Sequence, residues 1–163
     1  YMIHRIISHR GNLQNAIPEQ ENHPNYIDKA IEAGFHVEVD IRNSKDGFSL
    51  GHDKTDYLVT AKWILRRKRQ ILFHAKDIES GIRLRKLNSE IKYFMHLGDP
   101  FVLISNGLVW VHDLSLLSND RCIIPLIDKN SIDNFDFKDK MLYGVCTDEP
   151  IYLKEKLERN NII

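Results

Sequence analysis

The stretch FHVEVDIRNSKDGFSLGHD, residues 35–53, decides how this chain is interpreted. Apolar and polar residues alternate over 36–41, which is typical of a strand, and the KDG triplet at 45–47 favours a hairpin turn. Glu38 and Asp40 stand two residues apart, so both side chains point to one face of that strand. On a solvated edge strand the pair would need no explanation. On a buried face, one carboxyl group must take up a proton or share a cation with the other.

Length and composition indicate one domain over residues 1–163. The chain has 42% hydrophobic residues and zero formal net charge, so it can form a core and has no general attraction to nucleic acid. The basic run at 66–70 is interpreted as a solvated helix end. No run approaches the roughly 20 apolar residues of a membrane span, and no signal peptide is evident. Cys122 and Cys146 lie in apolar runs, which predicts buried, free thiols and a cytoplasmic location.

Strands alternate with helices in the first half of the chain, which predicts an α/β fold with a parallel sheet and crossover helices. Helices are expected over 25–34, 61–68, 79–91 and 149–160. Strands are expected over 4–9, 36–41, 71–76, 92–96, 101–105, 108–111, 122–126 and 142–147. Eight strands suit a (β/α)8 TIM-type barrel. The chain is shorter than the roughly 250 residues of such barrels, so a shortened barrel is expected, with several outer helices missing or reduced.

Polar side chains collect where the expected strands end. His9 and Arg10 end the first strand, His74 and Lys76 end the third, and His96 ends the fourth. Because the carboxyl ends of parallel barrel strands share one face, these side chains are expected to converge with the acidic pair. Oxygen ligands on neighbouring positions suit Mg²⁺ or Ca²⁺, so the pair is a candidate metal site.

Several motifs, in order, resemble those of the glycerophosphodiester phosphodiesterase family. They are HRGN at 9–12, PEQEN at 18–22, AIEAGFHVEVDIRNSKDGFSLGHD at 30–53 and GVCTDEP at 144–150. The match is strong over 6–53, fair over 71–77 and 142–156, and weak between. The resemblance implies a TIM barrel and a metal-dependent cleavage of a glycerol- or sugar-linked phosphodiester.

The resemblance also implies catalytic roles. His9 and His52 would be the general acid–base pair, a role that suits histidine because its pKa lies near neutrality. Arg10 would bind a phosphate oxygen with its forked donors, and Lys76 would also bind phosphate. His96 is a further candidate for contact with the substrate.

The resemblance makes Glu38 and Asp40 the metal ligands, but the third strand departs from the family pattern. The family carries Glu-x-Lys there, and this chain has His74 in place of the Glu. Mg²⁺ binds imidazole poorly, whereas Mn²⁺ and Zn²⁺ accept it. Either His74 is a ligand and the metal is Mn²⁺ or Zn²⁺, or His74 contacts only the phosphate or a metal-bound water.

The expected partner is a small phosphodiester substrate, with neither nucleic acid nor a membrane span, and an uncovered barrel surface would favour a homodimer. Two other functions fit the same motifs: a non-catalytic phosphate or glycan-phosphate binding protein, and a lyase that releases a cyclic phosphate. His36 and His112 are interpreted as structural or surface residues, Trp110 as a core residue, and Asp148 as a group that stabilises the end of the last strand.

Overall fold

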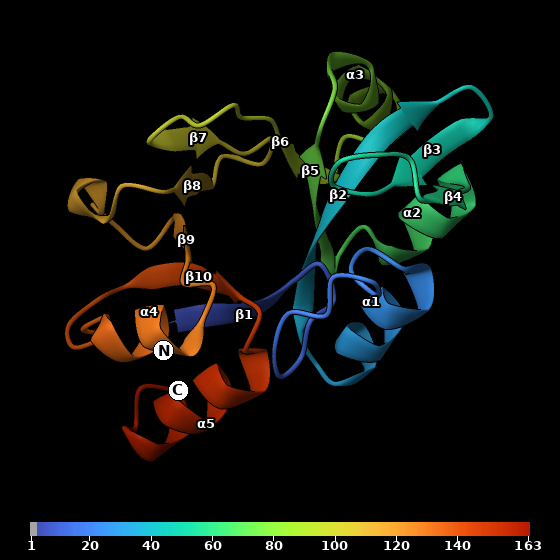
Figure 1. Ribbon diagram of the computed structural model, residues 1–163. Coiled ribbons are helices and arrows are strands. Elements are labelled where there is room, and N and C mark those ends of the chain that lie inside the picture. Colours follow the sequence, from blue (N-terminus) through green and yellow to red (C-terminus); the bar gives the residue numbers. More distant parts are fainter. Residues whose placement is uncertain (1–2) are drawn as a thin grey trace.

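The computed structural model describes residues 3–163 and shows a mixed ten-stranded sheet that curls into a half-barrel (Figure 1). Its strands are β1 (Ile3–His9), β2 (His36–Ser44), β3 (Gly47–Leu50), β4 (Tyr57–Val59), β5 (Ile71–Ala75), β6 (Lys92–Phe94), β7 (Phe101–Leu103), β8 (Val109–Val111), β9 (Cys122–Pro125) and β10 (Leu142–Thr147). Its helices are α1 (Pro24–Glu32), α2 (Ala61–Arg67), α3 (Ile78–Leu87), α4 (Lys129–Asn134), α5 (Pro150–Arg159) and the short 3-10 helix η1 (Leu114–Leu116).

The predicted (β/α)8 TIM-type barrel is wrong. All eight expected strands form, but β7 runs antiparallel to β8, and β3 and β4 extend β2 as an antiparallel meander. Within the described residues, the chain between β6 and β9 forms β7, β8 and the short 3-10 helix η1, but no α-helix. The reason is connection length: a parallel crossover takes about a dozen residues or more, and 95–100 and 104–108 are too short for one.

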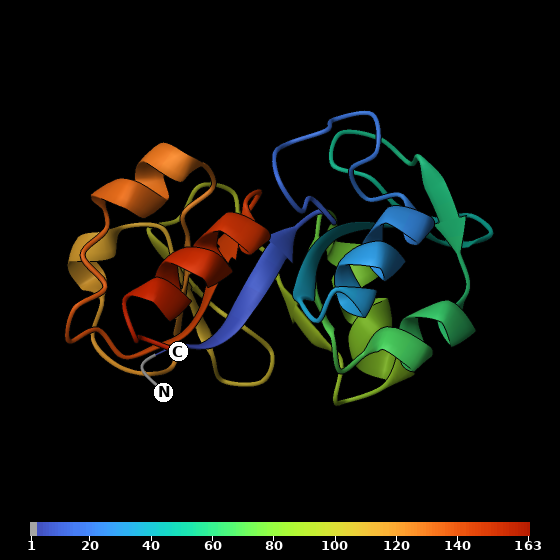
Figure 2. The ribbon, with the colours of Figure 1, turned by 90° about the horizontal axis from the view of Figure 1, so that it is seen from below.

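The sheet is built outward from β1. On one side β1 pairs in parallel with β10, followed by β9, β8 and β7. On the other side it pairs in parallel with β2, followed by β5 and β6. The two arms of the curl meet at Ser105, whose N–H donates to the carbonyl oxygen of Tyr93 at 2.9 Å. Seen from below, α1–α3 lie on one side of β1 and α4 and α5 on the other (Figure 2).

Three hydrophobic clusters hold this arrangement together. One packs α1, α2 and α3 against β2, β3 and β5, and another packs α4 and α5 against β1 and β8–β10. The third fills the inside of the curl with side chains from six strands and the 104–108 turn: Ile7, Leu72, Phe94, Ile104, Leu108, Trp110, Ile123 and Cys146. Both cysteines are buried and free, as predicted.

Strand β2 is buried on both faces, and this fixes the place of the acidic pair. Val37, Val39 and Ile41 are fully buried in the cluster beneath α1–α3. The alternate residues Glu38 and Asp40 therefore face the inside of the curl, where they are 2% and 0% exposed. The solvated edge-strand interpretation of the pair is excluded.

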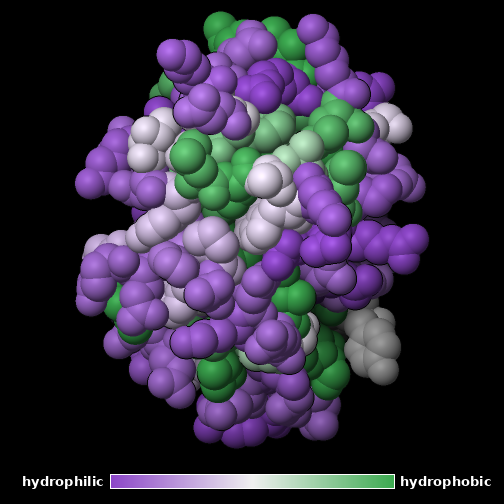
Figure 3. All heavy atoms as spheres, turned by 90° about the vertical axis from the view of Figure 1, so that its right-hand side faces the viewer, coloured by the Kyte–Doolittle hydropathy of each residue, from purple (hydrophilic) through white to green (hydrophobic). Residues whose placement is uncertain are grey.

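Exposed apolar side chains gather in two areas, with Met141 exposed apart from them. Residues 95–116 hold most of them: Met95, Leu97, Phe101, Leu103, Leu114 and Leu116. On the side that carries α2, α3, β3 and β4, the surface is mainly hydrophilic with an apolar patch (Figure 3), and the exposed apolar residues of these elements are Leu58, Ile78 and Ile82. The homodimer stays a prediction. In the described part of the chain, no helix combines the length and the apolar character needed to cross a membrane.

Candidate metal centre

Glu38, Asp40 and His74 form a buried group that can hold a metal ion. Each offers a ligand atom, and these atoms lie within 4.8 Å of one another. The sheet register brings them together, because Asp40 on β2 is the direct partner of His74 on β5. Nδ1 of His74 lies 3.3 Å from Oδ1 of Asp40 and 3.7 Å from Oε1 of Glu38. The convergence of these three side chains, predicted from strand alternation, is confirmed.

The hydrogen bonding of this group leaves polar atoms available to a cation. Oε2 of Glu38, Oδ1 of Asp40 and Nε2 of His74 are buried and have no hydrogen-bond partner among the described residues. Buried polar atoms are normally satisfied, so three such atoms in one group need an explanation. Two carboxylate oxygens and an imidazole nitrogen are a common ligand set for a divalent transition metal.

A stack of aromatic rings holds His74 in position. Its ring stacks on Phe94 and on His96, each with a centroid 4.7 Å away and with interplanar angles of 12° and 10°, and the centroids of those two rings are 5.8 Å apart. Phe94 in turn stacks on Trp110 at 4.8 Å. The stacking favours this plane of the imidazole, and Nδ1 at the ring edge faces the two carboxyl groups.

The two acids are not equivalent. Burial, together with the charge of Asp40, raises the pKa of Glu38 above its usual value. Burial also opposes ionisation of Asp40, but the contacts with His74, Arg10 and Asn22 outweigh it and hold the pKa of Asp40 well below its usual range. Asp40 is therefore the permanent anion of the centre, and Glu38 is the acid that gains most from a cation.

His9 lies beside this group and is oriented by Asp148. Nδ1 of His9 is 2.8 Å from Oδ1 of Asp148, and its Nε2 is 3.8 Å from Oε2 of Glu38. Burial lowers the pKa of His9, but the hydrogen bond to Asp148 and the charge of Glu38 raise it above the ordinary value. This contact was not predicted from the sequence. The signal for it was the pairing of the first and last strands of the expected barrel, which brings the ends of β1 and β10 together.

Two predicted phosphate-binding residues also reach the group. Arg10 places Nε 2.9 Å from Oδ2 of Asp40 and donates from Nη1 to Oε2 of Glu21 at 3.0 Å. Lys76 has its Nζ 3.9 Å from Oδ1 of Asp40. Both cations therefore neutralise Asp40 in this structure, and their contact with a phosphate stays a prediction.

The loop between β1 and α1 supplies residues that sequence reasoning did not assign. Asn22 clamps Asp40: its Nδ2 donates to Oδ2 and its Oδ1 accepts from the backbone N–H, each at 2.9 Å. Asn12 donates from Nδ2 to Oδ1 of Asp148 at 2.8 Å and to Glu21 at 3.0 Å. These side chains belong to the HRGN and PEQEN motifs, so the motifs themselves were the signal.

His52 is not brought into the group. Its Nδ1 lies 2.7 Å from Oδ1 of the exposed Asp53, and its side chain is 40% exposed. The backbone before it is anchored, because the N–H of Gly51 donates to the carbonyl oxygen of Asp40 at 3.1 Å. Within residues 3–163, no hydrogen bond or ion pair links the His52 ring to the three candidate ligands.

His96 lies at the edge of the centre, together with His112. The N–H of Gly98 donates to Nδ1 of His96 at 3.2 Å, so the proton of the neutral His96 ring is on Nε2, 3.4 Å from Nε2 of His112. Trp110 donates from Nε1 to the same His112 atom at 3.0 Å. Burial, followed by the charges of His74 and His112, lowers the pKa of His96 to about 4. His96 is thus a neutral hydrogen-bonding group at the edge of the centre, and its contact with a substrate stays a prediction.

The comparisons with known proteins do not extend this picture. No protein-family model matches the chain, and no relative is found among curated proteins. The glycerophosphodiester phosphodiesterase resemblance therefore stays a prediction from the sequence motifs.

Proposed function

We propose that the protein is a metal-dependent phosphodiesterase that cleaves a glycerol- or sugar-linked phosphodiester. One observation carries the proposal: a buried Glu38–Asp40–His74 group with unsatisfied ligand atoms, beside a histidine oriented by an aspartate. The motif resemblance supports the same reaction.

The metal is proposed to be Mn²⁺ or Zn²⁺. His74 supplies nitrogen to a ligand set that otherwise offers only carboxylate oxygen, and these ions accept imidazole. If only the two carboxylates bind, Mg²⁺ or Ca²⁺ is the expected ion. Titration of the protein and its His74→Ala variant with all four ions separates these cases. Loss of Mn²⁺ and Zn²⁺ affinity in the variant supports the ligand role, and unchanged affinity overturns it.

The surrounding residues would divide the chemistry. When bound, the metal would polarise a phosphoryl oxygen and offset negative charge. His9 would exchange a proton with a substrate oxygen through Nε2, because Asp148 occupies Nδ1. Arg10 and Lys76, held at Asp40, would stabilise charge that develops on the phosphoryl group.

Turnover of a panel of glycerol- and sugar-linked phosphodiesters, followed by phosphorus NMR, tests the proposal. His9→Asn is expected to lower kcat by about 100-fold or more, the size of effect typical of general acid–base catalysis. The matched control is His23→Asn, because His23 caps α1 and contacts Tyr57 instead of the metal group. Saturable phosphodiester binding without turnover would overturn the catalytic proposal and favour the binding protein.

A lyase that releases a cyclic phosphate is the second candidate. Formation of the cyclic phosphate and its opening by water each need a proton acceptor and a proton donor, and the resemblance assigns one of these two roles to His52. Its ring faces Asp53 and does not contact the metal group in the structure. Accumulation of a cyclic phosphate in the wild-type reaction would identify the lyase, whereas a monoester would identify the hydrolase.

A further inference from the structure

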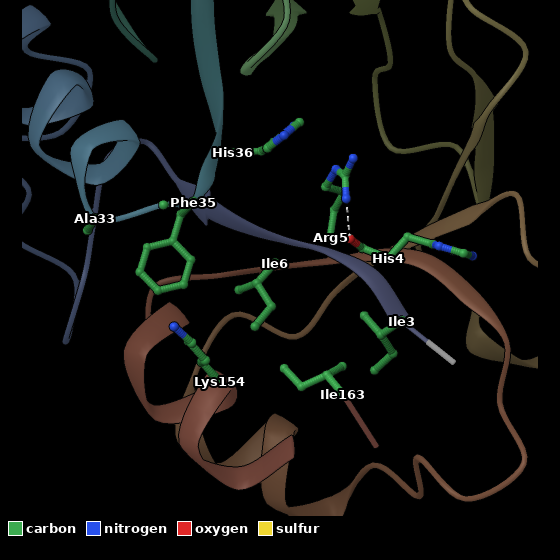
Figure 4. Close-up of a pocket in the computed structure, with 10 residues that line it drawn as sticks. Ile3, His4, Arg5, Ile6, Ala33, Phe35, His36, Lys154 and Ile163 are labelled. Atoms are coloured by element: carbon green, nitrogen blue, oxygen red, sulfur yellow. Dashed lines mark hydrogen bonds between the residues drawn. The ribbon is translucent and has the colours of Figure 1, made fainter. Parts of the chain in front are cut away.

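The opposite mouth of the curled sheet carries a second cluster of titratable groups. Arg5 precedes Ile7 by two residues on β1, and Ile7 is the register partner of His36 at the start of β2. Arg5 and His36 point to the same side of β1, whereas Ile6, Phe35 and Lys154 lie on its other side (Figure 4). Lys92 on β6 is the partner of Leu72, which faces the inside of the curl as Ile7 does.

These cations have no counter-charge. Among residues 3–163, no ion pair involves Arg5 or Lys92: Arg5 donates to the carbonyl oxygen of His4 at 2.7 Å, and Lys92 to that of Arg69 at 2.6 Å. The adjoining pocket, of about 530 Å³, has no acidic residue in its lining, to which His4, Arg5, His36 and Lys154 contribute. Arg5 and Lys92 therefore lie at this mouth without an ion-pair partner in the described part of the chain.

The titration behaviour of the cluster agrees with its geometry. Burial, followed by the charge of Arg5, lowers the pKa of Lys92 to about 8. Burial, then Lys92 and Arg5, lower the pKa of His36 to about 4. An anion placed between Arg5 and Lys92 would relieve the repulsion between these two cations.

From this arrangement we infer that Arg5, His36 and Lys92 form a binding site for a phosphate-class oxyanion at the amino-terminal mouth of the sheet. A guanidinium offers forked donors that match a tetrahedral oxyanion, and an ammonium adds a compact charge. On β2, His36 is two residues, roughly 7 Å, from Glu38 and four residues, roughly 13 Å, from Asp40, so the anion would bind on the amino-terminal side of the metal centre. The inference goes beyond the proposed phosphodiesterase function and does not depend on it.

Inorganic phosphate is the probe, added to the whole protein in EDTA while backbone amide NMR shifts are followed. Chloride at equal ionic strength is the control for general salt effects. Saturable shifts are expected at the first residues of β1, β2 and β6 with phosphate and not with chloride. Shifts confined to the surroundings of His9 and Asp148, or no saturable shifts, would overturn the inference.

Three variants localise the binding. Arg5→Gln and Lys92→Gln are each expected to weaken phosphate binding by about tenfold, as the loss of one charged contact does. Lys129→Gln is the matched control, since it removes one positive charge on α4, where Lys129 faces Glu149. If one of the first two variants does not fold, the other decides; unchanged affinity in a folded variant overturns the assignment of that residue.

Glu38→Gln should retain phosphate binding. Loss of metal binding at the metal centre is thereby distinguished from loss of phosphate binding at the amino-terminal mouth.

Discussion

The two mouths of the curled sheet present opposite electrostatic problems. At the carboxyl ends of β1, β2 and β5, two buried acids meet Arg10, Lys76 and His74, yet three ligand atoms stay unsatisfied. At the amino ends, Arg5 and Lys92 are near enough to repel each other and have no ion-pair partner among residues 3–163. The same strand serves both mouths, because His36 begins β2 and Asp40 lies further along it. The nearest residues of the two mouths on β2, His36 and Glu38, are two positions apart, and we expect each mouth to be neutralised by a ligand of its own.

The largest expected effect is on metal affinity at the acidic mouth. Asp40→Asn and Glu38→Gln should each weaken Mn²⁺ or Zn²⁺ binding by about 100-fold or more, because each removes a charged ligand from a three-residue set. Calorimetric titration measures the change. Phosphate binding at the basic mouth should be unaffected; a parallel loss there would show that the two mouths are not independent.

Stability without metal should separate the two acids. Asp40→Asn is expected to lower the free energy of unfolding in EDTA by about 3 kcal/mol, because Arg10 and Lys76 lose their buried counter-charge. Glu38→Gln should stay within about 1 kcal/mol of the wild type, because it relieves repulsion between neighbouring carboxyl groups. Urea unfolding is the measurement, and equal losses in the two variants would contradict the assignment of Asp40 as the permanent anion.

Acidic pH should lower the free energy of unfolding through His36, at the amino-terminal mouth of the sheet. The pKa of His36 is about 4 in the folded protein and near 6.5 when unfolded, so the unfolded chain binds the proton more readily. The contribution of neutral His36 is therefore complete above pH 6.5 and is lost as the pH falls towards 4. After a discount for partial exposure, the loss amounts to about 2 kcal/mol. His36→Gln should flatten this part of the stability profile, and an unchanged slope would refute the shift.

The smallest expected effect concerns repulsion at the same mouth. In phosphate-free buffer, Lys92→Gln should raise the free energy of unfolding by about 0.5 kcal/mol, because Arg5 and His36 lose a cationic neighbour. Added phosphate should reverse the order of stability by favouring the wild type. A lower stability of the variant in both buffers would indicate that Lys92 serves packing and its bond to Arg69 instead.

Much of the local structure was predictable, and the topology was not. Pro24 and Gly34 bracket α1 as expected, since proline suits a first helical turn and Gly34 adopts φ +91° after the helix. All eight expected strands form because their apolar patterns are strong. The antiparallel pairing of β7 with β8 follows from the short 104–108 turn. The barrel prediction used the number of strands and did not consider the length of this turn.

The acidic site was predicted more fully than the fold. Alternation along one strand placed Glu38 beside Asp40, and the register of β2 with β5 then brought His74 to them. The position of His52 could not be obtained in this way. The hairpin motif gives the spacing of His52 from the strand. The direction of the His52 ring depends on its contact with Asp53, an exposed residue whose side-chain position no sequence pattern predicts.

The stacked rings of Trp110, Phe94 and His74 have an optical consequence. Trp110 is 4% exposed and is joined to a candidate metal ligand through a single phenyl ring, whereas Trp63, the other indole, lies on α2 under the guanidinium of Arg67. Arrival of a paramagnetic ion such as Mn²⁺ at His74 should quench the emission of Trp110 more than that of Trp63. The protein thus carries an internal fluorescent probe of its own metal occupancy, readable without a label or a substrate.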